Sequence, residues 1–279
     1  MLKLDDVDAR RKRFVALVVL ALLAATSVAW VFSRRVEPVY DGRPLTFWAQ
    51  QYGSNNWRSG GKNLARGAEF AIQQIGTNAI PFLLDLMQAQ DSDLKKRLRQ
   101  HLPRTWHDQL HLKDKSGDLR RVGAHGLAAL GTNAPAAVPA LIKLAKQNPD
   151  VDGRYIAVFA LRALGATAEA AIPFYIECLT NKDATIRNEA AVGLALIPHR
   201  RETALPALLT YLESINTSNG WELYSAIELL GRFGANAKPA VPRLLSLLND
   251  ANPNVRQAVT NSLLWIDPDA AEKAQVRRR

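Results

Sequence analysis

The sequence predicts an all-α protein, an α-solenoid of stacked antiparallel helix pairs preceded by one N-terminal transmembrane helix. Three observations lead to this prediction. A segment of about 33 residues recurs along most of the chain, the copies have glycine and proline at recurring offsets, and an uncharged apolar run occupies positions 14–32. The 279 residues are 48% hydrophobic with one cysteine, so the chain can bury a core but holds no disulfide framework or cysteine-rich zinc site.

Five copies of the repeat each combine an apolar helical run, a turn and a proline near the start of a second apolar run. These prolines are Pro81, Pro139, Pro173, Pro206 and Pro242, and from Pro139 onward their spacings are 34, 33 and 36 residues. Eight residues before the last four prolines stand the turn residues Gly131, Gly165, Pro198 and Gly234, whereas Gly76 precedes its proline by five. Glycine ends a helix because it accepts left-handed backbone, and proline is tolerated in a first helical turn.

One position of the first helix is an arginine in most copies. In seven copies it is occupied, in chain order, by Ala65, Lys95, Arg120, Arg154, Arg187, Leu223 and Arg256. Asp or Asn residues stand just before most of these helices, where their side chains can accept from the unpaired N–H groups of a helix N-terminus. The copy that Lys95 opens has a degenerate second helix, and the last copy is truncated. Because one helix pair cannot bury its apolar face alone, the copies must stack.

These residues carry a resemblance to a known family. Paired helices of about 33 residues with D-x-x-V/I-R, then A-L/I-x-x-G and V/I-P-x-L, are similar to HEAT repeats, and the short alanine-rich form resembles the HEAT-like repeats of phycobilisome lyases. The resemblance covers residues 62–276, and the preceding PVYDGRPLTFW resembles the lead-in of bacterial membrane-anchored HEAT-repeat proteins. It implies an armadillo-type superhelix whose concave surface holds a partner, usually another protein. It implies no chemistry, because binders and a few enzymes share the fold.

The segment Phe14–Phe32 is the predicted transmembrane signal anchor. Its nineteen uncharged residues nearly match the ~30 Å hydrocarbon core of a bilayer. Five Lys and Arg residues precede it and three follow it closely, so we expect a single-pass inner or cell membrane protein with a cytoplasmic N-terminus and an extracytoplasmic repeat domain. The alternative is a signal peptide cleaved after Ala29, which would give a secreted protein.

The predicted domains are a cytoplasmic basic tail at 1–13, the membrane segment at 14–32, a linker at 33–61, the repeat domain at 62–276 and a basic tail at 277–279. Within the linker, Leu45–Tyr52 is expected to form a short amphipathic helix that docks on the repeats. Of the net charge of +10, +4 belongs to residues 1–36 and +3 to residues 277–279. Only Lys95–Arg121 is locally basic in the rest; we expect a solvated helix face there, with nucleic-acid binding as an alternative.

Histidine and cysteine give little indication of chemistry. His107 and His111 are spaced i, i+4 as in a zinc-protease helix, but Asp108 replaces its glutamate and no third ligand stands at a family spacing. Deoxyhypusine hydroxylases, which are HEAT enzymes, bind iron through His-Glu pairs, and this chain has no such dipeptide. Cys178 lies within the mostly apolar segment Pro173–Leu179 of a second helix, so we expect a buried thiol. We therefore predict no catalytic, cofactor or metal site; a HEAT-like lyase or a metal-dependent enzyme using His107 and His111 is the alternative.

Three tryptophans are the predicted partner-binding residues. Trp57, Trp106 and Trp221 lie near loops or helix starts, and exposed aromatic side chains favour interfaces. Trp265 instead follows the apolar pattern of its repeat and is expected in the core. Together with the repeats, these features predict a non-catalytic protein–protein interaction scaffold, tethered to the lipid bilayer through Phe14–Phe32, with another protein as its partner.

Overall fold

The computed structural model describes residues 36–53, 62–110, 112, 115–197, 201–216 and 218–276. The chain divides into two compact units, Met1–Glu37 and Pro38–Arg279, and every helix and strand of the described residues lies in the second. Trp57, His111 and Arg277–Arg279 lie outside the described residues.

The prediction of a single-pass membrane protein is contradicted. No helix among the described residues is long and apolar enough to cross a bilayer. The longest of them, α7 (Ser116–Leu130), has 15 residues and so measures about 22 Å, short of the ~30 Å hydrocarbon core. The segment Phe14–Phe32 and the cleavage site after Ala29, on which the predictions of location were based, lie outside the described residues.

The linker closes the N-terminal end of the repeats. β1 (Val39–Tyr40) and β2 (Arg43–Pro44) pair as an antiparallel hairpin whose turn residues, Asp41 and Gly42, both have positive φ. The next element, α2 (Leu45–Gly53), is the predicted amphipathic helix: Leu45 and Ala49 are fully buried, and the helix contacts both α3 (Lys62–Ile75) and α7. A solenoid needs such a cover, because its end layers would otherwise expose apolar surface.

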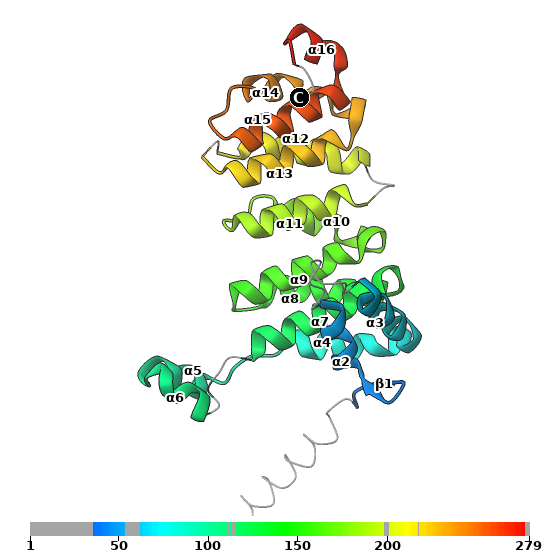
Figure 1. Ribbon diagram of the computed structural model, residues 1–279, viewed down its shortest axis with the longest axis vertical. Helices are drawn as coiled ribbons and strands as arrows, with labels where there is room; N and C mark the ends of the chain where they lie inside the picture. The colour runs from blue at the N-terminus through cyan, green and yellow to red at the C-terminus, as the bar shows by residue number, and fades with distance from the viewer. Residues whose placement is uncertain are drawn as a thin grey trace, which may run out of the picture. The chain divides into compact units, whose positions relative to one another are not determined.

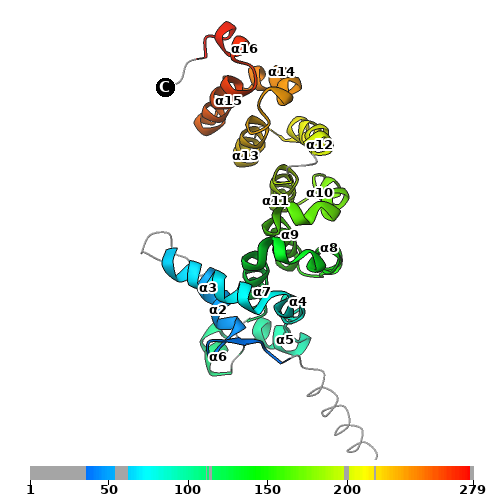
Figure 2. The same ribbon diagram turned by 90° about the vertical axis from the view of Figure 1, so that its right-hand side faces the viewer.

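The rest of the unit is a stack of helix layers, which confirms the predicted all-α solenoid (Figures 1 and 2). The first helices are α3, α7, α9 (Val151–Ala163), α11 (Ala184–Ala195), α13 (Gly220–Gly231) and α15 (Pro253–Ile266). The second helices are α4 (Ile80–Met87), α8 (Val138–Gln147), α10 (Ile172–Cys178), α12 (Arg201–Ser214), α14 (Val241–Ser246) and α16 (Pro268–Lys273). From α7 to α15 each first helix contacts the next, and Figure 2 shows them in one row beside the row of second helices.

Four turns within the layers have the predicted chemistry. Gly76, Gly131, Gly165 and Gly234 have φ between +51° and +65°, a region that L side chains rarely adopt. Short 3₁₀ stretches follow these glycines: η1 (Gly76–Ala79), η2 (Gly131–Asn133) with η3 (Pro135–Ala137), η4 (Gly165–Ala171) and η6 (Gly234–Ala240). Proline then lies in the first turn of the second helix. Pro206 differs, because α12 has no glycine turn before it and already begins at Arg201, which places the proline inside the helix.

In four copies the arginine of the repeat ties the first helix to the connection before it. In three copies its Nη1 atom donates to the carbonyl oxygen six residues earlier, over 2.6–2.7 Å: Arg154 to Asn148, Arg187 to Asn181 and Arg256 to Asp250. Arg120 is 3% exposed, donates to the carbonyl oxygen of Ala89 at 3.1 Å and pairs with Asp150 at 2.6 Å. The marker that identified the repeat is therefore structural.

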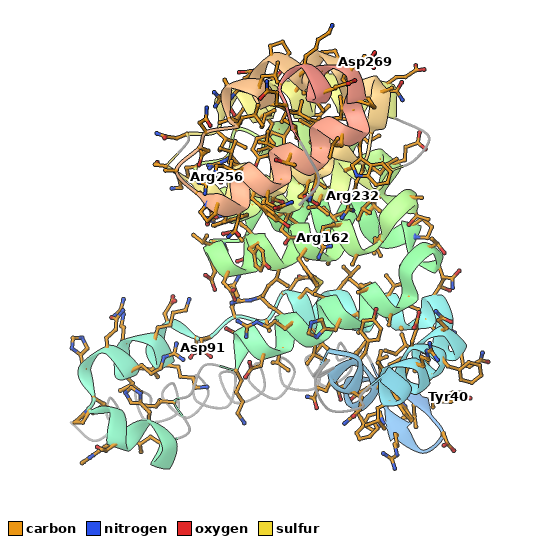
Figure 3. The ribbon with its side chains drawn as sticks, turned by 45° about the horizontal axis from the view of Figure 1, so that its top comes forward. Tyr40, Asp91, Arg162, Arg232, Arg256 and Asp269 are labelled. Atoms are coloured by element: carbon orange, nitrogen blue, oxygen red, sulfur yellow. The ribbon has the colours of Figure 1, made fainter. Side chains whose placement is uncertain are left out.

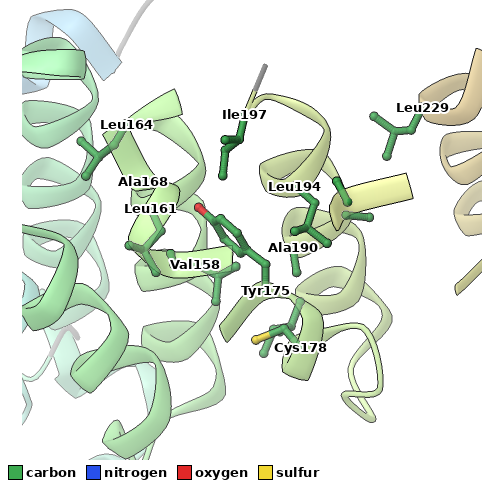
Figure 4. Close-up of a cluster of buried hydrophobic side chains, with 14 of the residues drawn as sticks. Val158, Leu161, Leu164, Ala168, Tyr175, Cys178, Ala190, Leu194, Ile197 and Leu229 are labelled. Atoms are coloured by element: carbon green, nitrogen blue, oxygen red, sulfur yellow. The ribbon is translucent and has the colours of Figure 1, made fainter. Parts of the chain in front are cut away.

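The hydrophobic core continues from layer to layer. Figure 4 shows Tyr175 of α10 between Val158 and Leu161 of α9 and Leu194 of α11. A Cβ atom at Gly193 would lie 2.7 Å from the Tyr175 ring, so α10 and α11 approach each other where only glycine fits.

Residues 88–115 form an insertion between α4 and α7, not the repeat copy predicted at Lys95. α4 contacts α7 directly, as α8 contacts α9. The insertion contains α5 (Asp93–His101) and α6 (Arg104–Gln109), which Figure 1 shows to one side of the stack. α5 has no buried residue, because Leu94 and Leu98 are too few to form the apolar stripe that packing between layers requires.

Candidate interaction surface

The exposed sides of α9, α11, α13 and α15 form a continuous surface, which we call the first-helix face. On α13, Trp221 and Tyr224 are 49% and 41% exposed, and the three- and four-residue spacing from Trp221 places Tyr224, Glu228 and Arg232 on the same side. The opposite side of α13 is buried against its neighbours. The aromatic rings of this surface are therefore held by a helix whose other face is fixed in the core.

Trp265 belongs to this surface, which corrects its prediction as a core residue. It lies on α15 and is 66% exposed. Seven residues separate it from the buried Ala258, so helical periodicity alone predicts burial. At that end of α15, however, the neighbouring α13 ends in Gly231, and Gly231 and Gly234 line the hollow beside the indole.

A hollow of about 660 Å³ opens beside Trp265, between α13 and α15. Its lining residues are Glu228, Gly231, Arg232, Gly234, Asn261, Ser262 and Trp265. The hydroxyl group of Ser262 donates to the carbonyl oxygen of Ile227 at 3.1 Å, and a Cβ atom at Gly231 would lie 2.7 Å from that hydroxyl oxygen. The floor of the hollow is thus close-packed, while its rim offers a carboxylate, a guanidinium, an amide and an indole to a partner.

One ion pair joins α9 and α11 on the first-helix face. Arg162 of α9 donates to Glu189 of α11 at 2.5 Å, and its guanidinium also lies 5.0 Å from the ring centroid of Phe159. Figure 3 shows Arg162 and Arg232 on the stack and Asp91 at the insertion, away from them. This part of the face therefore combines aromatic surface with charge that is already neutralised.

The predicted partner-binding tryptophans do not form one surface. Trp106 lies on α6 of the insertion and is 52% exposed, whereas Trp221 lies on α13. Both views of the ribbon place α6 and α13 at different levels of the stack (Figures 1 and 2). Trp57 is outside the described residues, so only Trp221 of the three is placed on the first-helix face.

A buried polar cluster at the α11–α13 junction escaped prediction. Glu222 is 1% exposed; it accepts from Nε and Nη2 of Arg187 at 2.6 Å each, from the Tyr211 hydroxyl at 2.8 Å and from Asn219 at 2.6 Å. The hydrogen bond to Glu222 raises the pKa of Arg187, and burial, followed by that carboxylate, raises the pKa of Tyr211. In the sequence, this copy differs from its neighbours in having Leu223 at the arginine position of the repeat, and that difference alone marked the junction. Because both carboxylate oxygens already have partners, the cluster joins α11, α12 and α13 and stabilises the stack.

The histidines and the cysteine do not form a cluster in the part of the chain that the structure describes. Nε2 of His107 lies 3.1 Å from the carbonyl oxygen of Leu102, and His111 is outside the described residues. Within the described part of the chain, no three His, Cys, Asp or Glu side chains converge as metal ligands would. Cys178 is 6% exposed, as predicted, and burial raises the pKa of its thiol to about 12, so it is a poor nucleophile.

The basic stretch Lys95–Arg121 is divided between the insertion and α7. On α5, Lys95 and Arg99 pair with Asp91, and Lys96 lies 3.9 Å from Asp93. On α7, Arg120 is buried against Asp150, and Arg121 lies 3.3 Å from Asp118. These carboxylates neutralise much of the charge that contacts with nucleic-acid phosphates would use.

Comparisons with known proteins agree with the repeat. The HEAT-repeats family model matches residues 108–195 and 138–218, and a HEAT-repeat model matches residues 240–264. No curated protein matches the chain. A solved structure of the CpcE–CpcF complex of phycocyanin lyase from Nostoc sp. is 26% identical, with a TM-score of 0.44 over 59% of this chain and 66% of that chain, just under two thirds of its length. An engineered protein is 15% identical, with a TM-score of 0.43 over 82% of this chain and 97% of its own. The chain therefore contains HEAT repeats, as its sequence pattern predicted.

Proposed function

We propose that this chain is a non-catalytic protein-interaction scaffold whose first-helix face holds another protein. One observation carries the proposal: Trp221, Tyr224 and Trp265 are exposed on two adjacent helices, and Trp265 borders a hollow of about 660 Å³. Large aromatic side chains beside a hollow are the usual centres of protein–protein binding energy. The HEAT repeats support the same function, since stacked repeats create extended binding surfaces.

The opposite row of helices provides a natural comparison. On the second helices, Ile176 of α10 and Leu245 of α14 are 37% and 36% exposed, and single exposed aliphatic residues are ordinary on soluble proteins. The first-helix face instead exposes aromatic rings on helices that are packed into the core. Binding there orders few additional side chains and so loses little conformational entropy. The proposal therefore assigns the partner to one face of the stack.

Site-specific photo-crosslinking tests this assignment. A photoreactive amino acid replaces Trp221, Tyr224 or Trp265 in the full chain made in its own cells, with Ile176 and Leu245 as matched control positions. We expect one protein to crosslink from the three aromatic positions and not from the controls. With that protein purified, alanine at Trp221 or Trp265 should weaken binding roughly thirtyfold or more, the effect of losing a hot-spot side chain.

Equal crosslinking from both rows of helices would contradict the proposal. The enzyme alternative has its own test, because HEAT-like solenoids include enzymes. Metal bound to the purified full chain, lost together with an activity in His107→Ala, would replace the scaffold by a metal-dependent enzyme. Neither result depends on the other, since His107 lies on α6 and the aromatic residues lie on α13 and α15.

A further inference from the structure

The insertion at residues 88–115 exposes the apolar side chains of both its helices. Leu94 and Leu98 of α5 are 69% and 39% exposed, Trp106 of α6 is 52% exposed, and Leu110 just after α6 is 50% exposed. The four-residue spacing places Leu94 and Leu98 on one side of α5. Leu110 donates its N–H to the carbonyl oxygen of Trp106 at 3.0 Å, so it continues the helical turn and lies on the same side as Trp106. The insertion is not a layer of the stack, because α4 contacts α7 directly.

The charged side of α5 faces the connections at the two ends of the insertion, which leaves its apolar side outward. Arg99 pairs with Asp91, whose side chain is 8% exposed, and its Nη1 atom donates to the carbonyl oxygen of the buried Leu112 at 3.1 Å. Lys95, one turn earlier, lies 3.6 Å from the same aspartate. Ordinary surface helices have the reverse arrangement, with leucines inward and cations in water.

The positive net charge of residues 37–276 comes from the insertion. Residues 88–115 have seven Lys and Arg against four Asp, whereas the rest of residues 37–276 have 19 basic and 19 acidic side chains. Arg97 is exposed on α5, next to Leu98 and one turn after Leu94. Lys115, the last residue of the insertion, is also exposed. Outward leucines and a tryptophan within a positively charged segment are typical of helices that lie in the interface of an anionic membrane.

We propose that this insertion rests on the surface of an anionic phospholipid bilayer. Leu94, Leu98, Trp106 and Leu110 enter the boundary between headgroups and acyl chains, and Arg97 and Lys115 lie among the lipid phosphates. Nucleic acid fits the surface less well, because it would engage the cations, several of which already pair with Asp91 and Asp93, and would leave the leucines in water. The proposal concerns residues outside the first-helix face and does not depend on the proposed function.

Tryptophan fluorescence of the full chain tests the proposal. The emission of Trp106 is obtained as the difference between the parent and Trp106→Phe, with Trp265→Phe as the control, on adding vesicles of equimolar phosphatidylcholine and phosphatidylglycerol. Residues 1–35 are the same in every variant, so any lipid affinity of that segment cancels in the difference. We expect a blue shift assigned to Trp106 and not to Trp265, absent with pure phosphatidylcholine and weakened by added salt.

Two variants measure the contributions of apolar surface and charge. Leu94→Ser/Leu98→Ser removes two leucines and should reduce the partitioning that this signal reports at least tenfold, a factor that the burial of a single leucine already accounts for. Arg97→Gln should reduce it roughly fivefold, the effect of one cation near an anionic surface. Because these side chains are exposed, the far-UV circular dichroism and thermal midpoint should match the parent. The absence of a Trp106 shift, an equal shift with neutral vesicles, or an unchanged shift in Leu94→Ser/Leu98→Ser overturns the proposal. A change in Trp106 emission caused by duplex DNA and not by vesicles would instead identify a nucleic-acid surface.

Discussion

The ion pair between Arg187 and Glu222 should stabilise the stack far more than a surface pair of similar length. Glu222 is 1% exposed, and both of its oxygens lie 2.6 Å from guanidinium nitrogens. Lys146 and Glu177 join two layers at 2.5 Å, but their side chains are 46% and 60% exposed. Glu222→Gln keeps the shape of the side chain and removes the charge opposite Arg187, and Glu177→Gln makes the same change at the surface.

The burial of the two pairs sets the expected magnitudes. Removing one partner of a buried pair costs about 3–5 kcal/mol, because the other charge is left uncompensated. The Arg187 side chain is 21% exposed, so water compensates part of its charge and we expect Glu222→Gln to cost about 3 kcal/mol. Glu177→Gln should cost at most about 1 kcal/mol, since solvent screens both partners.

Urea unfolding followed by far-UV circular dichroism measures the free energies of unfolding. The parent, Arg187→Met, Glu222→Gln and their double variant form one thermodynamic cycle, and Lys146→Met with Glu177→Gln forms the control cycle. We expect a coupling energy of about 2 kcal/mol or more in the first and below about 1 kcal/mol in the second. Equal coupling energies, or a parent-like unfolding curve for Glu222→Gln, would refute the reasoning.

Three further predictions concern buried groups. Tyr175→Phe should raise the free energy of unfolding by about 1 kcal/mol in urea unfolding, because the hydroxyl is buried with no hydrogen-bond partner among the described residues; a loss of stability would contradict this. Gly193→Ala should lower it by about 1–3 kcal/mol, because the added methyl group meets the Tyr175 ring, whereas Gly67→Ala, with nothing within 4 Å, should raise it by about 1 kcal/mol. Burial, with a smaller contribution from Arg121, lowers the pKa of His125. As the pH falls, the unfolded chain therefore protonates at His125 before the folded chain does, and this favours unfolding. At pH values below ~6.5, the thermal midpoint should decrease with falling pH more steeply for the parent than for His125→Gln. Parallel curves for the two proteins would exclude the effect.

Much of the stack could be predicted because its rules are local. A glycine at Gly131 or Gly165 determines a turn through the φ angle of one residue, and a proline such as Pro139 fits only the first turn of the helix that follows. Asp183 caps α11 by accepting from Thr185 at 2.8 Å, a contact that spans two residues. The burial of Cys178 likewise followed from its apolar neighbours.

The remainder depended on partners distant in the sequence. Lys95 stands in the same local pattern as the arginines of the repeat, yet α5 lies outside the stack because α7 offers α4 the larger apolar face. Trp265 shares a helical side with a buried alanine and is nevertheless exposed, beside a hollow that Gly231 of another helix also lines. Such outcomes require knowing which helices meet.

The class of fold, the positions of most layers and the chemistry of their glycine turns follow from the sequence alone, because each depends on a few consecutive residues repeated many times. Tertiary structure alone decided the features that bear on function. The outward leucines of the insertion, the hollow beside Trp265 and the partnership of Glu222 with Arg187, 35 residues away, all follow from which surfaces pack and which remain in water. That competition for burial involves the whole stack, and no local pattern encodes it.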